Sequence, residues 1–295
     1  MHRRTPDADI YYVVNRNERP EYVNLSFRIK GRQPEVWDPI KGTMMQQTLY
    51  TTDNERVQLP MFLPPFGSTF VVFRKPVQAH VTTLVKDGAE LFPTLPADTF
   101  AEAPFVQQAA GLLFTAPGSY SLAHSNGKVQ TKDMHTAELP LNAPWQVSFS
   151  KAWGGPENIV FDRLISWPDH TNDGIKYYAG TAVYRQRVNL TAAQLKSKVW
   201  LDLGAVYNIA EVHINGRDAG VWWAPPFTGD ISAYVKEGGN ELEIKIVNLW
   251  PNRIIGDQLL PEDKRFTKTN VKKFGKDYPL RKSGLLGPVR LRFYE

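Results

Sequence analysis

The chain has 295 residues, of which 42% are hydrophobic and 22% charged, and it carries a formal net charge of +5. This composition is typical of a globular protein of about two domains, and it excludes a disordered chain. No apolar run approaches the roughly 20 residues of a helical membrane span. The absence of cysteine excludes disulfide scaffolds, thiolate zinc sites and cysteine nucleophiles.

Residues 9–75 form a run of predicted short strands. The clearest is at 23–29, where Val23, Leu25, Phe27 and Ile29 alternate with polar residues, as on a half-buried strand. Further strands are predicted at 11–15, 48–51, 56–59 and 69–73. We therefore expect residues 1–75 to form a small antiparallel β-sandwich.

Residues 76–143 carry a weaker pattern. The segment 98–113 is the best helical stretch of the chain, although Pro104 interrupts it. Short strands are predicted near 112–115, 118–123 and 128–131, with Asn126-Gly127 as a hairpin turn. We expect a connector with a small β element.

Residues 144–295 are again rich in predicted strands. Residues 240–248 place Leu242, Ile244 and Ile246 on one face, and other strands are predicted at 181–188, 199–203, 209–214 and 289–294. Short helical fragments are expected only at 191–196 and 231–235. The spacing of about ten residues between strands favours a jelly-roll or a similar sandwich.

The chain lacks the common catalytic motifs. It contains no Gly-x-Ser-x-Gly, no His-Glu-x-x-His, no phosphate-binding Gly-rich loop and no EF-hand, and its six histidines are scattered. A pair of carboxylates could perform glycosidic acid–base chemistry. However, the barrel that usually carries such a pair needs about 250 residues, for which this chain has no room.

Two loops have the composition of a carbohydrate site. A sugar offers apolar ring faces and peripheral hydroxyls, so its site needs an aromatic plane together with amides, carboxylates or Arg. The first loop, at 220–227, contains Trp222 and Trp223, which face opposite ways if extended. The second runs over 248–253 and leads to Gly256-Asp257. The candidate ligand-binding residues are Trp222, Trp223, Trp250, Asn252, Arg253 and Asp257. The alternative is that the three rings only close the end of a sandwich.

Two further segments could bind a ligand. The polar, turn-rich loop 167–174 contains Asn172 and Asp173. The alternative is that it is an ordinary solvated loop. In residues 264–282, Lys and Arg predominate around Phe266, Phe274 and Tyr278. This basic stretch suits an acidic polysaccharide and, by charge alone, nucleic acid. The alternative is a solvated loop or a face that docks on another domain.

The sequence resembles parts of known glycoside hydrolases. Residues 175–257 resemble the sugar-binding jelly-roll of family 2, through IKYYAGTAVYRQRV at 175–188, LDLGAVYNIAEVHINGRDAGVWWAPPF at 201–227 and GGNELEIKIVNLWPNRIIGD at 238–257, with SGLLGPVRL at 283–291. Almost the whole chain resembles the C-terminal region of family 106, the α-L-rhamnosidases. There, HRRTPDADIYYVVNR at 2–16 and GRQPEVWDPIKG at 31–42 are similar to the β-sandwich that follows the catalytic barrel.

The resemblance implies an all-β fold of two or more antiparallel β-sandwich domains, ending in a galactose-binding-like jelly-roll over residues 144–295. It implies an extracellular or periplasmic location, although the chain's start is not a signal peptide. Those enzymes are much longer and their barrel is missing here, so we expect a fragment and transfer no catalytic or barrel-bound calcium residues. Rim loops of related jelly-rolls touch substrate, which makes Asn172, Asp173, Asn252, Arg253 and Asp257 candidate contacts.

Three functional hypotheses follow. The first is a non-catalytic carbohydrate-binding portion of a rhamnosidase-like enzyme acting on pectin-type plant cell-wall glycans. The second is an enzyme in its own right, with unidentified carboxylates. The third is a structural brace for the missing catalytic domain, which a large exposed apolar patch would favour. No cofactor is expected, and the sequence leaves open whether a structural calcium is bound. Nucleic-acid binding is a fourth and much weaker hypothesis.

Overall fold

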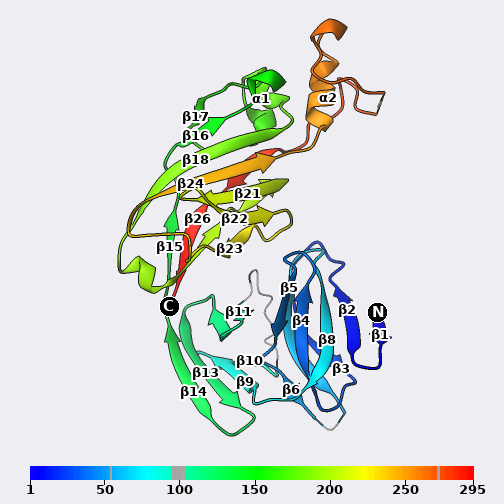
Figure 1. The fold of residues 1–295 in the computed structure, drawn as a ribbon, viewed down its shortest axis with the longest axis vertical. Coiled ribbons are helices and arrows are strands. Elements are labelled where there is room, and N and C mark those ends of the chain that lie inside the picture. Colours follow the sequence, from blue (N-terminus) through cyan, green and yellow to red (C-terminus); the bar gives the residue numbers. More distant parts are fainter. Residues whose placement is uncertain (54, 95–101, 103, 271–272) are drawn as a thin grey trace. The chain divides into compact units, whose positions relative to one another are not determined.

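The computed structural model describes residues 1–53, 55–94, 102, 104–270 and 273–295, and about half of them lie in strands, which pair antiparallel (Figure 1). The predicted all-β, multi-sheet fold is thus confirmed. The chain divides into two compact units, Met1–Thr136 with Tyr294–Glu295 and Ala137–Phe293. The boundaries expected at residues 75 and 143 stay predictions. Within the described residues, no helix is long and apolar enough to cross a membrane.

The first part of unit 1 consists of two sheets around one core. Their orders are β1-β2-β8-β4-β5 and β3-β7-β6. The core includes Phe27, Tyr50, Leu59, Val71 and Phe73. The strands are β1 (His2–Arg4), β2 (Asp9–Val14), β3 (Glu21–Phe27), β4 (Arg32–Asp38), β5 (Thr43–Gln46), β6 (Thr51–Thr52), β7 (Val57–Leu63) and β8 (Ser68–Pro76).

The GRQPEVWDPIKG segment has a structural use in β4. Glu35 is 3% exposed and pairs with Arg74 at 2.9 Å and Lys75 at 2.9 Å, while the Trp37 indole donates to it at 3.2 Å. Burial alone would raise the pKa of Glu35, but these hydrogen bonds outweigh burial and hold the pKa below its ordinary value. The carboxylate therefore ties β4 to the neighbouring β8.

The second part of unit 1 has its own core, formed around Leu84, Phe92, Phe114 and Tyr120. The sheet order is β10-β9-β13-β14, beside the hairpin β11-β12. The strands are β9 (Val81–Lys86), β10 (Ala89–Phe92), β11 (Phe105–Gln108), β12 (Gly111–Phe114), β13 (Gly118–His124) and β14 (Val129–Met134).

The segment 98–113, the best helical stretch of the sequence, contains no helix where the structure describes it. Residues 105–108 and 111–114 pair as a hairpin, from Phe105 opposite Phe114 to Gln108 opposite Gly111. Pairing buries Leu113 and Phe114, and this tertiary gain outweighs the modest helix preference of the segment. Residues 98–101 and 103 lie outside the described residues.

Unit 2 is a sandwich of a four-stranded sheet, β15-β26-β19-β23, and a six-stranded sheet, β17-β16-β18-β24-β21-β22. A single core joins residues of both, such as Leu201 and Leu291 with Val212 and Ile244. The strands are β15 (Thr136–Pro140), β16 (Trp145–Ser148), β17 (Ile159–Phe161), β18 (Thr181–Leu190), β19 (Lys198–Asp202), β20 (Ala205–Tyr207), β21 (Ile209–Ile214), β22 (Arg217–Trp222), β23 (Thr228–Asp230), β24 (Gly238–Val247), β25 (Gly284–Gly287) and β26 (Arg290–Tyr294).

The alternation of apolar and polar residues at 240–248 explains why β24 has one buried face within the six-stranded sheet. Leu242, Ile244 and Ile246 of β24 are fully buried, and β24 pairs with β18 over its whole length. That the fold is specifically a galactose-binding-like jelly-roll stays a prediction.

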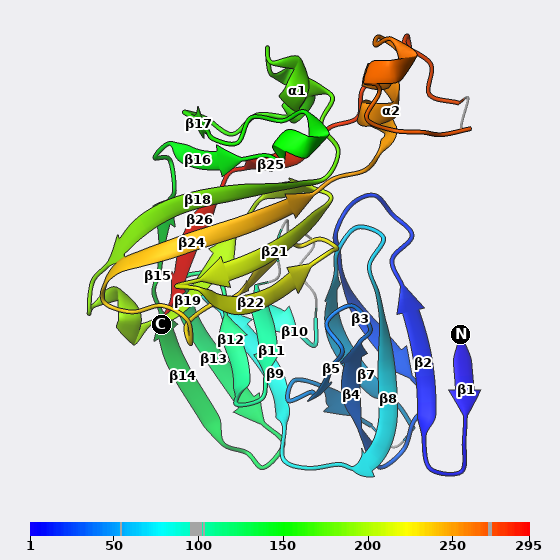
Figure 2. The ribbon, with the colours of Figure 1, turned by 45° about the horizontal axis from the view of Figure 1, so that its top comes forward.

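The helices of unit 2 are short, and α1 and α2 lie at the same end of the unit (Figures 1 and 2). The fragment expected at 231–235 is a turn, and only 194–196 of the other fragment is helical. The helices are η1 (Lys151–Trp153), η2 (Trp167–Asp169), α1 (Asp173–Lys176), η3 (Gln194–Lys196), α2 (Pro251–Asp257) and η4 (Glu262–Lys264), where η marks a 3-10 helix.

Candidate functional site

The loops around residues 172 and 250 meet at the helical end of unit 2. Gly256 of α2 packs so closely on Tyr177 that a side chain there would collide with it. The rings of Trp153 and Trp250 meet edge to face, with centroids 5.3 Å apart. Segments far apart in sequence thus form one rim, which we call the α2 rim: η1, α1 and α2 with the adjoining residues 281–283.

Arg253 and Asp257 lie beneath this rim as a buried ion pair. They are 4% and 1% exposed, and the Arg253 Nε lies 3.0 Å from the Asp257 Oδ1. Asp257 also accepts hydrogen bonds from the Phe266 and Thr267 amides and from the Thr267 hydroxyl. Burial lowers the pKa of Arg253, and the negative charges of Asp257 and Asp173 oppose that shift. In this structure the pair fastens the chain after α2 instead of facing solvent.

Asn252 is likewise engaged within the chain. Its amide donates to the Arg281 carbonyl at 2.7 Å and its oxygen accepts from the Arg281 amide at 2.8 Å. It is 1% exposed. This pair of bonds holds residues 281–283 against the first turn of α2, so Asn252 positions the basic side chains next to it.

Asn172 and Asp173 are exposed at the start of α1. The Asn172 side chain accepts a hydrogen bond from the Gly174 amide at 2.8 Å, which caps the helix. Asp173 occupies the first helical turn. The Asp173 carboxylate remains on the surface of the rim.

The three tryptophans named by the sequence differ in their surroundings. Trp222 is partly buried and packs on the sandwich core, where its ring lies against Gly229. Trp223 and Trp250 are 53% and 52% exposed. The adjacent Trp222 and Trp223 therefore divide between core and surface, while Trp250 projects from the α2 rim.

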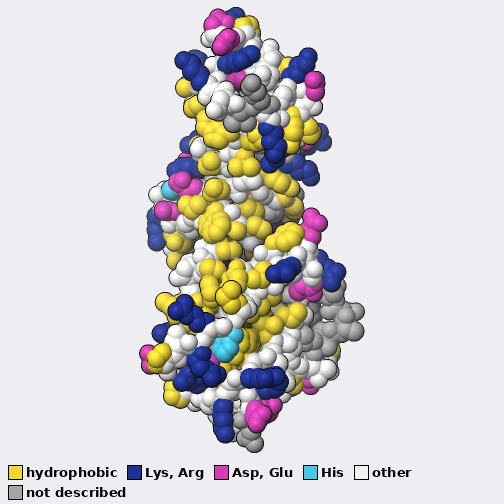
Figure 3. Space-filling view, turned by 90° about the vertical axis from the view of Figure 1, so that its right-hand side faces the viewer, with side chains coloured by type: hydrophobic (Ala, Val, Ile, Leu, Met, Phe, Trp, Pro, Cys, Tyr) yellow, Lys and Arg dark blue, Asp and Glu magenta, His cyan; other side chains and the backbone are white. Residues whose placement is uncertain are grey.

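A hollow of about 410 Å³ lies in unit 2, lined by both sequence neighbours of Trp250, Leu249 and Pro251, but not by Trp250 itself. It joins apolar side chains with amides and two cations. Its lining residues are Tyr207, Asn208, Leu249, Pro251, Asn252, Arg281, Lys282 and Ser283. Figure 3 shows hydrophobic side chains exposed at this end of the molecule among Lys and Arg.

Sequence reasoning missed Tyr207 and Asn208 as lining residues, and Trp153 as the partner of Trp250. Arg281 and Lys282 belong to the predicted basic stretch 264–282. A single Tyr-Asn at the end of a strand gives no signal in the sequence, because only the folded topology brings it next to α2. Within the described ranges, no group of three or more His, Asp or Glu side chains could hold a metal ion.

The arrangement can recognise a ring that has an apolar face and polar substituents. Trp250 offers a plane, Leu249 and Pro251 add apolar surface, and Asn208 adds an amide. Arg281 and Lys282 are exposed and can donate to hydroxyl or carboxylate oxygens. A sugar, and in particular an acidic one, fits this chemistry.

Comparison with known proteins finds similarity to glycoside hydrolases. Residues 1–52 match the model of glycoside hydrolase family 106, described as α-L-rhamnosidase. The rhamnosidase from Novosphingobium sp. PP1Y matches 100% of this chain at 31% identity and a TM-score of 0.74. A Formosa agariphila protein named "Putative beta-glucuronidase" is 38% identical over 202 residues, which is 59% of this chain.

The chain spans 23% of that rhamnosidase and 17% of the Formosa protein. The resemblance to family 106 is confirmed by the family match and by the structural match over the full length. The chain is therefore related to glycoside hydrolases and is similar, from end to end, to one part of an α-L-rhamnosidase.

Proposed function

We propose that this chain is the carbohydrate-binding, non-catalytic portion of an α-L-rhamnosidase-like glycoside hydrolase that acts on pectin-type plant cell-wall glycans. The observation that carries the proposal is the exposed Trp250 ring beside a hollow lined by Asn208, Arg281 and Lys282. The same resemblance supports an extracellular or periplasmic location.

A sugar would bind with an apolar ring face on Trp250. The edge-to-face contact with Trp153 holds the indole in place, so binding loses little side-chain freedom. Asn252 holds the backbone of Arg281, which brings this cation to the hollow before a ligand arrives. A preorganised plane next to fixed donors is what recognition of a sugar requires.

The two cations favour a glycan that contains acidic residues. Rhamnogalacturonan fits, because its backbone alternates rhamnose with an acidic sugar. The name of the Formosa relative also refers to the glycoside of a uronic acid. The buried Arg253, Asp257 and Asn252 would then support the site from below, whereas Asp173 and Asn172 would border it.

Isothermal titration of the purified chain with rhamnogalacturonan oligosaccharides tests this proposal. We expect saturable binding that Trp250→Ala weakens by about tenfold, the loss of roughly one ring contact. Leu259→Ala is a matched control, since Leu259 is equally exposed at 53% but, unlike Trp250, does not stand between two residues that line the hollow. Trp223→Ala tests whether the other exposed indole contributes.

Equal losses for Trp250→Ala and Leu259→Ala would contradict the proposal. So would sugar release from an aryl α-L-rhamnoside by the chain alone, since that result would make the chain an enzyme.

The structural brace is a second candidate, because apolar side chains are exposed near the α2 rim. Leu249, Trp250 and Leu259 are 46%, 52% and 53% exposed, which is typical of surfaces that meet another protein part. If the chain is a structural brace, calorimetric titration with any glycan should give no binding heat. It also predicts that Trp250→Ala and Leu249→Ala alter only association with a catalytic domain supplied in trans.

A further inference from the structure

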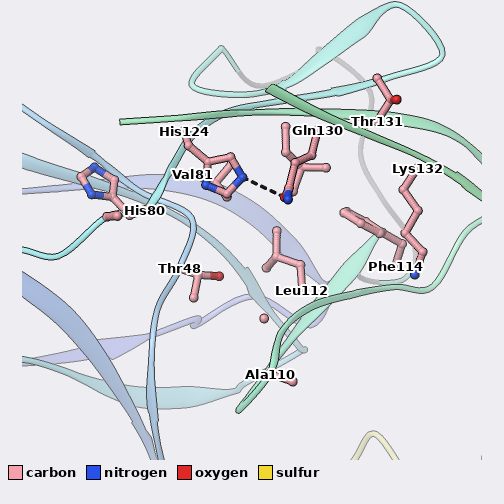
Figure 4. Close-up of a pocket in the computed structure, with 13 residues that line it drawn as sticks. Thr48, His80, Val81, Ala110, Leu112, Phe114, His124, Gln130, Thr131 and Lys132 are labelled. Atoms are coloured by element: carbon pink, nitrogen blue, oxygen red, sulfur yellow. Dashed lines mark hydrogen bonds between the residues drawn. The ribbon is translucent and has the colours of Figure 1, made fainter. Parts of the chain in front are cut away.

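A second hollow lies in unit 1, far in sequence from the α2 rim. It measures about 590 Å³, which falls in the range of small-molecule sites. The hairpin β11-β12 forms one side and the strands β13 and β14 form the other (Figure 4). No sequence signal marked it, because its polar residues are spread over four segments.

The apolar side of this hollow comes from Leu112, Phe114 and Leu122. Phe114 is buried and stacks on Tyr120, with ring centroids 4.0 Å apart. Both belong to the second core of unit 1, so this surface is anchored by packing. It offers a fixed apolar floor rather than a mobile one.

The polar side comes from β13 and β14. Gln130 and Lys132 are two residues apart on β14 and therefore project from the same face of the strand, toward the hollow in Figure 4. The His124 ring lies 3.0 Å from the Gln130 Oε1, which leaves the Gln130 amide nitrogen to donate elsewhere. Lys132 makes one long bond, 3.4 Å, to the main-chain oxygen of Glu295, which in this 295-residue chain belongs to the terminal carboxylate. An ammonium has three donors, so Lys132 can still donate to a ligand.

The charge of this hollow has one sign. Its lining includes Lys132 but, within the part of the chain that the structure describes, no Asp or Glu. His80 also borders it, but burial lowers the pKa of this imidazole, and its Nδ1 lies 2.7 Å from the Gln78 carbonyl. Lys132 therefore stands beside an apolar floor and an amide, and the Glu295 main-chain carboxylate that it contacts does not line the hollow.

We propose that this hollow is a second saccharide subsite, which takes a sugar residue that carries a carboxylate. The carboxylate pairs with Lys132, an apolar ring face lies on the Leu112–Phe114 side, and Gln130 and His124 meet hydroxyls. That the ligand is a saccharide rests on the proposed function. The position of the subsite in unit 1 and its preference for a sugar that carries a carboxylate go beyond that function. A glycan could then be held at two places.

Proton NMR of the full chain, titrated with a galacturonate disaccharide and with its methyl ester, tests the subsite. The C–H signals of the imidazoles are the readout, with the His124 signal assigned by His124→Gln. We expect the acid to shift the His124 signal in a saturable way and to bind about tenfold more tightly than the ester, as one charge-assisted pair provides.

The decisive variant is Lys132→Met, which keeps the length of the side chain and removes its charge. It is expected to abolish the preference for acid over ester at His124. Lys128→Met is the matched control, because Lys128 is exposed in the turn of the same hairpin and does not line the hollow. It should leave the preference unchanged.

An unmoved His124 signal at millimolar acid would overturn the subsite, as would equal losses in Lys132→Met and Lys128→Met, which would indicate diffuse attraction of anions. The Trp250→Ala variant separates the two proposals. If it retains the His124 response, the unit 1 subsite stands even where the α2 rim fails. If oligosaccharide binding survives Lys132→Met and is lost in Trp250→Ala, the rim stands and the unit 1 subsite fails.

Discussion

The body of helix α2 and the residues around its N-terminus use similar residue types in opposite ways. In the body of the helix, Arg253 and Asp257 are buried and paired with each other, and Asp257 is also bound to the following segment. At its N-terminus, Trp250 is half exposed beside the exposed cations Arg281 and Lys282. In sequence, both look like ligand-binding loops. The difference teaches that a polar residue in a loop indicates a ligand site only if the fold leaves its hydrogen-bonding groups free.

The largest effect is expected from breaking the buried pair. Arg253→Ala leaves Asp257 charged and buried, so we expect the free energy of unfolding to fall by about 3–5 kcal/mol, as for other buried pairs that lose one partner. Urea unfolding of unit 2 measures this. Asp173→Asn, at an exposed carboxylate of the same rim, should change stability by less than about 0.5 kcal/mol. Equal effects would show that the pair is not structural.

A smaller loss is expected from Glu35 in unit 1. Glu35→Gln removes the charge that Arg74 and Lys75 share, and should lower the free energy of unfolding by about 1–3 kcal/mol at pH 7. Because the pKa of Glu35 is lowered by folding, its contribution is present above its ordinary value of 4.5 and is lost as pH falls through the folded pKa.

The difference between wild type and Glu35→Gln should therefore shrink as the pH is lowered from 7 to 3. Urea unfolding at a series of pH values checks it. A difference that stays constant over this range would mean that the carboxylate charge does not stabilise the β4–β8 pairing.

Trp250 is expected to matter for affinity more than for stability. Its exposed ring contacts Trp153, so Trp250→Ala should cost only about 1 kcal/mol of unfolding free energy. Glycan affinity should fall about tenfold in parallel. Thermal unfolding and calorimetric titration of one sample measure the stability and the glycan affinity. A large loss of stability without loss of binding would show that Trp250 is a structural residue and not a ligand contact.

The smallest effect is expected at the cap of α1. Asn172→Ala removes the acceptor of the Gly174 amide and should cost about 0.5–1 kcal/mol. Asn172→Asp keeps an acceptor and should cost less. If Asn172→Ala instead weakened glycan binding with no change in stability, Asn172 would be a ligand contact and not only a cap.

Much of the fold could be predicted, because strands that bury one face alternate in sequence. Leu242, Ile244 and Ile246 are the clearest case, and all three are buried. The strand at 105–108 is not predicted, although one near 112–115 is, because the Ala- and Gln-rich segment has a local helix preference that gives way to a hairpin burying Leu113 and Phe114. Local preference is weak evidence when long-range pairing decides.

The candidate site could be predicted only in outline. The sequence located Trp250 and the basic stretch, but charged residues such as Arg253 and Asp257 are usually exposed, so their burial gave no warning. Tyr207, Asn208 and Trp153 reach the rim only through sheet topology. The same holds for the hollow in unit 1, whose polar residues Gln130 and Lys132 follow an ordinary hairpin turn.

The central claim is that this chain binds carbohydrate by itself. The most direct test is calorimetric titration of the wild-type chain with a rhamnogalacturonan tetrasaccharide. We predict a saturable heat, with an affinity that falls about tenfold in Trp250→Ala while the variant stays folded. No heat from a folded wild-type chain at millimolar glycan would contradict it and leave the α2 rim as a surface for another part of the enzyme.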